Sequence, residues 1–229
     1  MLAFFLDAAD GRFPPEDGSV TVLPALRPAL EASVAFTGHA VIATALPPPD
    51  VLAQRPDGLG GSLTPGFLRF LAGRAGWIGS IDVTLAARGA GGEPCLAPHE
   101  GYAHHPRVRY ARRLRADVRV FADERGIVTL SQGLAGRREL SIELHDPHRD
   151  GGRGFGRSLL VDALTLVPEG EPVFAAVAPG NARSLRAFLS VGFLPIGAEV
   201  LLEPDRSDAD TPPLDTPIVD GRYHGRMEQ

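Results

Sequence analysis

One short segment, HRDGGRGFGRSLL at residues 148–160, constrains the fold of this chain more than any other. Four of the six residues from Gly151 to Gly156 are glycine, and an apolar run with helical spacing follows until Pro168. An alternating strand pattern, RELSIELHD, comes before the segment. Strand, glycine-rich loop and helix in this order present the unpaired N–H groups of a helix start at the end of a sheet.

The second half of the chain predicts a complete α/β unit. Alternation and turn residues predict three consecutive strands at 117–122, 127–134 and 139–145. A helix at 156–167, a strand at 173–178, a helix at 181–191 and a strand at 193–202 follow. The predicted order from residue 117 is therefore β-β-β-α-β-α-β.

The first half carries many proline and glycine breaks, such as PPPD at 47–50. Between the breaks we predict strands at 20–23, 40–45 and 78–87, and helices at 26–36 and at 65–72 with Thr64 as its cap. After the breaks, a further helix is predicted at 107–114. The loop-like stretch 88–106 is the expected boundary. We therefore expect an N-terminal α/β region at 1–105, a second region at 106–203 and an acidic, proline-rich tail at 204–229.

The composition excludes several classes of function. A net charge of −5 gives no reason to expect a nucleic-acid partner. The sequence contains no lysine, which excludes a Schiff-base lysine and a Walker A phosphate loop, and its single cysteine, Cys95, excludes an intrachain disulfide. No stretch has the length of a membrane span, and no signal peptide is recognisable, so we expect a cytoplasmic protein. Abundant arginine, alanine, glycine and proline indicate a GC-rich, bacterial genome.

The glycine-rich loop has the chemistry of a phosphate site. Glycines let an anion approach the backbone, and helix-start N–H groups carry a partial positive charge. Arg153 and Arg157 can add charge-assisted hydrogen bonds. A dinucleotide fingerprint does not align, because Gly154 and Gly156 are followed by Arg157, Ser158 and Leu159. The alternative is a flexible turn before a helix.

From residue 117 to 202 the chain resembles the GCN5-related N-acetyltransferases, the GNAT superfamily. Gly154 and Gly156 match the glycines of that family's coenzyme A pyrophosphate loop, [Q/R]-x-x-G-x-[G/A]. The run NARSLRAFLSVGF at 181–193 resembles a second family motif, N-x-x-[A/S]-x-x-x-Y-x-x-x-G-F. Together the two motifs are more specific than either one alone.

The resemblance implies a mixed, mostly antiparallel sheet flanked by helices, with the first half as an N-terminal α/β extension or a degenerate copy. It also implies that acetyl-CoA is the cosubstrate, that a primary amine attacks the thioester directly, and that no metal is needed. The residues implied to bind the cosubstrate are Leu144, His145, Asp146, Gly152, Arg153, Gly154, Phe155, Gly156, Arg157, Asn181, Ser184 and Phe188.

The chain departs from the family pattern at two places. Gly151 stands where Gln or Arg is usual, and the loop is one residue longer, so Arg149 or Arg153 could substitute. Phe188 stands at the position of the family's tyrosine, which often protonates the leaving thiolate. Phenylalanine cannot donate a proton, so we expect it to pack, and the acid to be another group, a water, or absent.

The candidate catalytic bases lie on the strand before the loop. Its alternation places Glu139 and Glu143 on one face, from which either could enter a cleft, and a solvated strand face is the plain alternative for each. His145 is a weaker candidate base. His99, His104 and His105 fit no common metal site, and we expect them to be a free surface cluster.

Several alternatives stay open at this point. The N-terminal half could complete the sheet, form a degenerate copy of the fold, or shape the acceptor site. The whole chain could be a non-catalytic acyl-CoA sensor, or an unrelated enzyme that binds nucleotide phosphates. A homodimer is possible, and the acceptor amine is not specified by the sequence.

Overall fold

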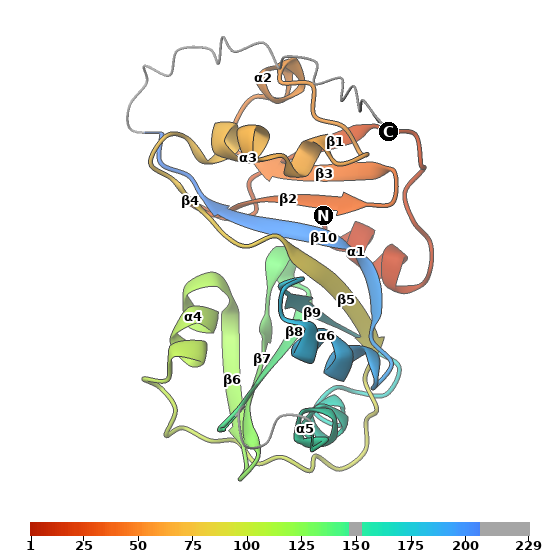
Figure 1. Cartoon of the computed structure of the whole chain (residues 1–229), viewed down its shortest axis with the longest axis vertical. Coiled ribbons are helices and arrows are strands. Elements are labelled where there is room, and N and C mark those ends of the chain that lie inside the picture. The colour runs from red at the N-terminus through yellow and green to blue at the C-terminus, as the bar shows by residue number, and fades with distance from the viewer. Residues whose placement is uncertain (147–152, 207–229) are drawn as a thin grey trace, which may run out of the picture.

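The computed structural model of this protein describes residues 1–146 and 153–206 (Figure 1). The strands are β1 (Val20–Pro24), β2 (Glu31–Phe36), β3 (His39–Thr44), β4 (Trp77–Ile78), β5 (Asp82–Arg88), β6 (Ala116–Ala122), β7 (Gly126–Gln132), β8 (Arg138–Leu144), β9 (Pro172–Val177) and β10 (Leu194–Glu203). The α-helices are α1 (Leu2–Ala9), α2 (Pro48–Ala53), α3 (Pro65–Ala72), α4 (Pro106–Leu114), α5 (Phe155–Leu164) and α6 (Ala182–Leu189), and two short 3₁₀ turns are η1 (Gly61–Leu63) and η2 (Leu134–Gly136).

The described strands form one ten-stranded sheet. Nine of them follow the order β1-β3-β2-β10-β5-β9-β8-β7-β6, and β4 pairs with one end of β10. Two neighbouring pairs, β1 with β3 and β8 with β9, are parallel, and the remaining pairs are antiparallel. The expected class, a mixed and mostly antiparallel sheet flanked by helices, is confirmed.

Strands from the two halves of the chain alternate in the middle of this sheet. β5 lies between β9 and β10, and β10 in turn pairs with β2. In Figure 1 β10 runs from the upper group of strands to the lower group. Strands before residue 105 and strands after it therefore share one hydrogen-bonded sheet.

Helices cover both faces of the lower part of the sheet. Leu159, Leu160 and Phe188, from α5 and α6, pack in one core with odd-numbered residues of β9 such as Val173 and Ala175. Phe5 of α1 packs with the even-numbered Phe174. Since successive strand residues point to opposite faces, α1 lies on the face opposite α5 and α6. Val108 of α4 contacts Val120 and Ile127, whereas their neighbours Phe121 and Val128 face α5, so α4 shares the face of α1.

Most predicted elements are confirmed within a few residues, but the helix predicted at 26–36 is wrong. That segment contains β2, which pairs on both sides with β3 and β10. Its polar residues Glu31 and Ser33 are buried, and each is hydrogen-bonded: Thr44 donates to the Glu31 carboxylate at 2.6 Å, and Ser33 donates to the Ser62 carbonyl at 2.8 Å. Two-sided strand pairing therefore overrides the helix-forming composition. Helices α1 and α2 were not predicted, and none of the helices in residues 1–146 and 153–206 is long and apolar enough to cross a membrane.

Candidate functional site

The sheet opens between its two parallel neighbours β8 and β9. Within the described residues, they share a single register pair, Glu139 opposite Phe174. Beyond that point both strands line a cavity of about 510 Å³, β8 through Ser141, Ile142 and Glu143 and β9 through Ala176 and Val177. The cavity therefore occupies the space where further strand pairing would otherwise continue.

This cavity is lined by residues from both faces of the sheet. Ile142, Val177 and Phe188 belong to the core on the α5 and α6 side. Arg107, Tyr110 and Leu114 of α4 line the cavity from the opposite side. The cavity therefore lies at the point where β8 and β9 separate, and residues from both faces of the sheet line it.

Helix α5 begins beside the end of β8 with the glycines that the sequence singles out. Gly154, the residue before the helix, has φ +85°, a left-handed conformation that favours glycine. A methyl group on Gly156 would lie 3.7 Å from Ala187, an ordinary contact with α6. Arg153 and Arg157 are exposed at the helix start. Gly152 lies outside the described residues, as do Gly151 and Arg149.

Helix α6 begins beside the end of β9, and its first residues also border the cavity. The Asn181 side chain accepts the backbone N–H of Ser184 at 3.1 Å and so caps the helix. Asn181, Ser184 and Phe188 all line the cavity. Phe188 is 3 % exposed and packs edge-on against Phe193, with ring centroids 4.9 Å apart. The residue at the family's tyrosine position is therefore an apolar wall.

The residues at the end of β8 lie in different surroundings. Leu144 packs against the core on the α5 side. His145 is exposed and turns to the β6–β7 turn, where its Nε2 lies 2.9 Å from the Asp123 carbonyl oxygen. Asp146 is the last described residue before the glycine-rich segment and is partly buried. Among these three, none lines the cavity.

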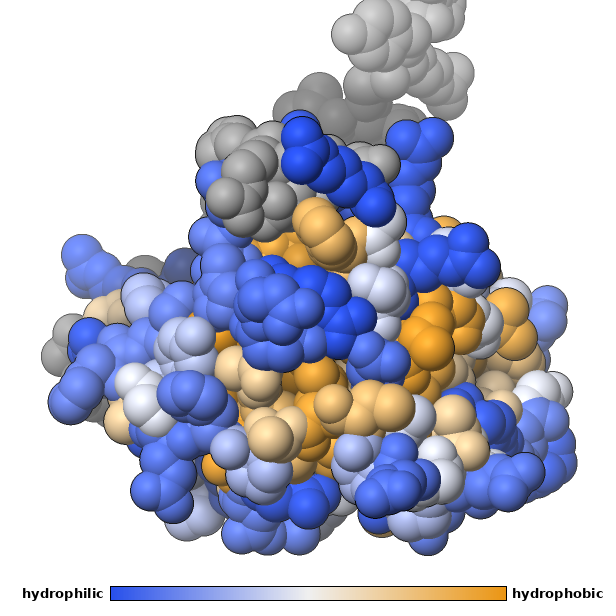
Figure 2. Space-filling model, turned by 90° about the horizontal axis from the view of Figure 1, so that it is seen from below, coloured by the Kyte–Doolittle hydropathy of each residue, from blue (hydrophilic) through white to orange (hydrophobic). Residues whose placement is uncertain are grey.

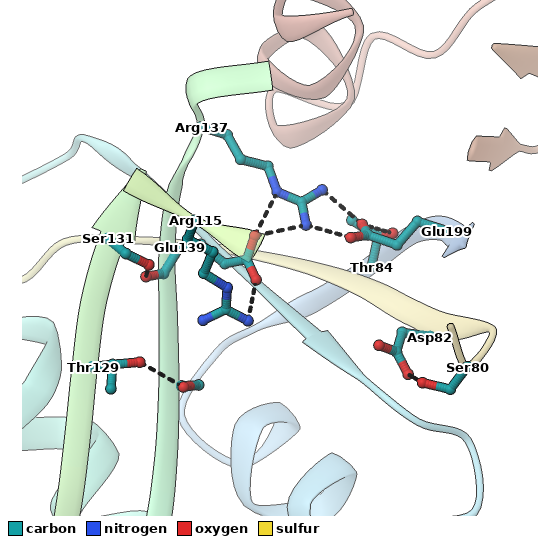
Figure 3. Close-up of polar contacts among 10 residues, drawn as sticks. Ser80, Asp82, Thr84, Arg115, Thr129, Ser131, Arg137, Glu139 and Glu199 are labelled. Atoms are coloured by element: carbon teal, nitrogen blue, oxygen red, sulfur yellow. Dashed lines mark hydrogen bonds and ion pairs between the residues drawn. The ribbon is translucent and has the colours of Figure 1, made fainter. Parts of the chain in front are cut away.

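Glu139 lies at the apex of the opening, inside a buried network of charges (Figure 3). Its carboxylate is 2.5 Å from Arg115 Nη2 and 3.1 Å from Arg137 Nη2. Arg137 is fully buried, and its guanidinium also contacts both oxygens of Glu199 at 2.7 Å. Burial raises the pKa of Glu139, but the charges of Arg115 and Arg137 lower it more, so the net pKa is below its ordinary value. Such a carboxylate is ionised and a weak proton acceptor.

Glu143 is the other glutamate of β8 and lies nearer the outside. It is 41 % exposed, and one of its oxygens accepts a hydrogen bond from Arg107 Nε at 3.0 Å. Both side chains line the cavity on the α4 side. This pair therefore neutralises charge at the cavity wall.

Asp82 is a cavity residue that the sequence analysis missed. It begins β5, lines the cavity, and its carboxylate accepts a hydrogen bond from Ser80 Oγ at 2.8 Å. Within residues 1–146 and 153–206 no arginine or histidine forms an ion pair with it. Burial raises the pKa of Asp82 above its ordinary value, and the charges of Glu199 and Glu139 also raise it, while the Ser80 bond and Arg115 act in the opposite direction. The sequence signal was an acidic residue in the middle of the strand predicted at 78–87.

Two aromatic residues border the same part of the cavity. Trp77 and Tyr110 line it, and the guanidinium of Arg113 lies 4.5 Å from the Trp77 ring and 5.9 Å from the Tyr110 ring. Burial raises the pKa of the Tyr110 phenol, and the charge of Asp82 raises it further. Asp82 and Tyr110 both line this cavity.

His99 and His105 of the 99–105 loop lie in a group of rings around Tyr102, and none of these three residues lines the cavity. Tyr102 lies 4.7 Å from His99, 6.0 Å from His105 and 5.8 Å from His145, measured between ring centroids. His105 also caps α4, because its Nδ1 accepts the backbone N–H of Arg107. No group of three or more possible metal ligands occurs in the part of the chain that the structure describes.

The end of the molecule that carries α5 has a mixed surface. Seen from that end, apolar surface lies among charged and polar side chains (Figure 2). The exposed apolar residues of α5 and α6 include Val161 and Leu189.

Comparisons with known proteins give distant structural neighbours only. No protein-family model matches the chain, and no curated protein sequence matches it. A conserved protein of unknown function from Staphylococcus epidermidis is similar with a TM-score of 0.40 and 12% identity, over 62% of this chain and 68% of that one. A protein from Novosphingobium aromaticivorans, assigned to acetyltransferases of the GNAT family, is similar with a TM-score of 0.36 and 13% identity, over 58% of this chain and 69% of that one.

Proposed function

We propose that this protein is an acetyl-CoA-dependent N-acetyltransferase that acts on a primary amine. The observation that carries the proposal is the cavity between β8 and β9, which is lined from both faces of the sheet, with a helix beginning beside the end of each strand. We propose that this cavity forms a passage through the sheet. A passage of this kind lets a cosubstrate enter from one face and an acceptor from the other. The reacting groups then meet at the separation of the strands.

The α5 and α6 side is suited to the cosubstrate. The N–H groups at the start of α5 have no partner within the helix and favour an anion, and Arg153 and Arg157 add positive charge beside them. Gly154 supplies the backbone conformation at that helix start. We assign the pyrophosphate to this position and the pantetheine arm to the cavity beside Asn181 and Phe188.

The chemistry is a direct transfer. The amine nitrogen forms a bond with the acetyl carbonyl carbon, and the bond from that carbon to sulfur breaks. The sulfur leaves with the electron pair. An ammonium substrate releases two protons in the course of the reaction: one neutralises the thiolate and the other goes to a base and then to solvent.

The first test is ligand binding, measured as a change in melting temperature with acetyl-CoA, coenzyme A and ATP. A ligand that binds only the folded state stabilises it by about 2.7 kcal/mol at a hundred times its dissociation constant. We expect acetyl-CoA and coenzyme A to stabilise the protein, ATP to have little effect, and the double variant Gly154→Asp, Gly156→Asp to abolish the response. A response to ATP alone would indicate a nucleotide-phosphate enzyme instead.

One observation favours a second candidate, a non-catalytic acyl-CoA sensor. Phe188 stands at the position of the family's tyrosine, is buried, and has no acidic proton to donate to the leaving thiolate. Binding of acetyl-CoA without transfer to any amine would support the sensor. Release of coenzyme A that depends on an added amine would support the enzyme.

A further inference from the structure

The inference concerns the acceptor side of the cavity and rests on the proposed function. We infer that the acceptor is a primary amine without a carboxylate, and that Asp82 binds its ammonium group and takes its proton. Trp77 and Tyr110 form the walls of this acceptor subsite. Asp82 and Trp77 come from the N-terminal half of the chain, outside the segment that resembles the acetyltransferase family.

Asp82 lies on the face of the sheet that α4 covers, opposite α5 and α6. Even-numbered residues of β5, such as Thr84 and Ala86, point away from the core that contains α5 and α6, because the odd-numbered Leu85 belongs to that core. Asp82 therefore lies on the same face of the sheet as α4, the helix that carries Tyr110 and Arg107. This is the side opposite the helix start that we assign to the cosubstrate.

The carboxylates that line the cavity differ in whether an arginine contacts them. Three other carboxylates line the cavity, and each contacts an arginine: Glu139 contacts Arg115 and Arg137, Glu199 contacts Arg137, and Glu143 contacts Arg107. Asp82 has no such contact among the described residues and accepts only the hydroxyl of Ser80. Figure 3 shows the Asp82–Ser80 pair separate from the arginine network. The cavity therefore keeps one carboxylate whose charge is not neutralised by a direct ion pair.

The walls of the acceptor subsite are aromatic. Trp77 and Tyr110 give this part of the cavity aromatic walls, and Arg113 already lies over both rings, 4.5 Å and 5.9 Å from their centroids. A cationic amine gains from Asp82 and packs its apolar part against the rings, whereas an added carboxylate on the acceptor would meet Asp82 as a like charge. Burial favours proton transfer to Asp82, because its pKa is raised toward the range of a working base.

The reaction at this subsite balances. The ammonium gives one proton to the Asp82 carboxylate, and the nitrogen lone pair then forms the bond with the acetyl carbon. The carbon–sulfur bond breaks, and the second amine proton neutralises the thiolate. Asp82 returns its proton to solvent.

The substrate class is tested with three acceptors on the same skeleton: 2-phenylethylamine, phenylalanine and phenylalaninamide. We expect kcat/KM for phenylalanine to be lower than for 2-phenylethylamine by roughly tenfold or more. Phenylalaninamide should recover most of the difference, because it keeps the bulk of the carboxylate and removes its charge. Equal or better use of phenylalanine, or no transfer to any of the three by a protein that binds acetyl-CoA, would overturn the inference.

The residue is tested with Asp82→Asn, a change that keeps the size of the side chain. We expect kcat/KM for 2-phenylethylamine to fall by about 10²–10⁴-fold, with acetyl-CoA binding and melting temperature retained. Asp50→Asn, on an exposed position of α2, is the matched control and should keep full activity. Full activity of Asp82→Asn would show that Asp82 is not the base. Failure of the unsubstituted protein to bind acetyl-CoA would be a different result, because it would overturn the proposed function and this inference with it.

Discussion

Arg137 contacts both carboxylate oxygens of Glu199 at 2.7 Å, although 62 residues separate the two in the sequence. The same guanidinium contacts Glu139 and lies 4.4 Å from the ring of Phe5 in α1. One buried side chain therefore joins β8, β10 and the first helix. It does so at the point where β8 and β9 begin to separate.

Arg137→Met should destabilise the protein strongly. The substitution leaves Glu139 and Glu199 buried with fewer positive partners, a type of change that costs about 3–5 kcal/mol. Arg138→Met is the matched control at the neighbouring position, because Arg138 forms a half-exposed ion pair with Glu171 and should contribute about 0–1 kcal/mol. The measurement is urea unfolding at neutral pH. Equal losses in the two variants would contradict the central role of Arg137.

Glu139→Gln should change how stability depends on pH. Because the pKa of Glu139 is lowered in the folded state, its charge contributes stability above its ordinary pKa of 4.5, and that contribution is lost as pH falls through the folded-state value. We expect the variant to be less stable at neutral pH and to approach the unsubstituted protein in acid. Unfolding free energies at a series of pH values test this. A constant difference between the two proteins at every pH would show that the Glu139 charge is not the cause.

Gly154→Ala and Gly156→Ala should differ in their effect on stability, and only the first should destabilise the protein. Gly154 has φ +85°, and a left-handed conformation costs an L-residue about 1–2 kcal/mol. Gly156 lies in the first turn of α5 with room for a methyl group, so alanine should be neutral or stabilise the helix by up to about 1 kcal/mol. Thermal unfolding of the two variants compares them directly. A larger loss for Gly156→Ala would contradict the left-handed conformation of Gly154 and the room for a methyl group at Gly156.

Ser80→Ala should move the pH profile of the transfer reaction. The Ser80 hydroxyl lowers the pKa of Asp82, so its removal raises that pKa further. If Asp82 must be ionised to accept a proton, kcat/KM falls as pH drops through this pKa, and the fall should begin at a higher pH in the variant. Ser190→Ala, at the exposed end of α6, is the control and should keep the original profile. An unchanged profile for Ser80→Ala would separate Asp82 from proton transfer.

The local part of this structure could be predicted well from the sequence. The glycines and the apolar spacing predict α5, and Asn181 followed by an amphipathic run predicts α6. These elements depend on neighbouring residues and on periodicity, both of which can be read directly.

The long-range part could not be predicted in the same way. Asp82 and Glu139 line one cavity only because β5 enters the sheet beside β9, a pairing that no local pattern encodes. The arginine partners of Glu139 likewise come from separate elements, since Arg115 follows α4 and Arg137 follows η2. The alternation of β8 predicted that its glutamates share a face, but it gave no information that both would form ion pairs with arginine.

The position of β10 has a consequence for how the chain folds during synthesis. β10 is the last of the described strands to leave the ribosome, yet it pairs with β2 on one side and β5 on the other. Until it arrives, both of those strands have an open edge, and open edges promote pairing with other chains. Contacts between such distant residues also slow folding, because long loops must close first. A chain truncated before Leu194 should therefore aggregate, even though most of the cavity-lining residues would be present.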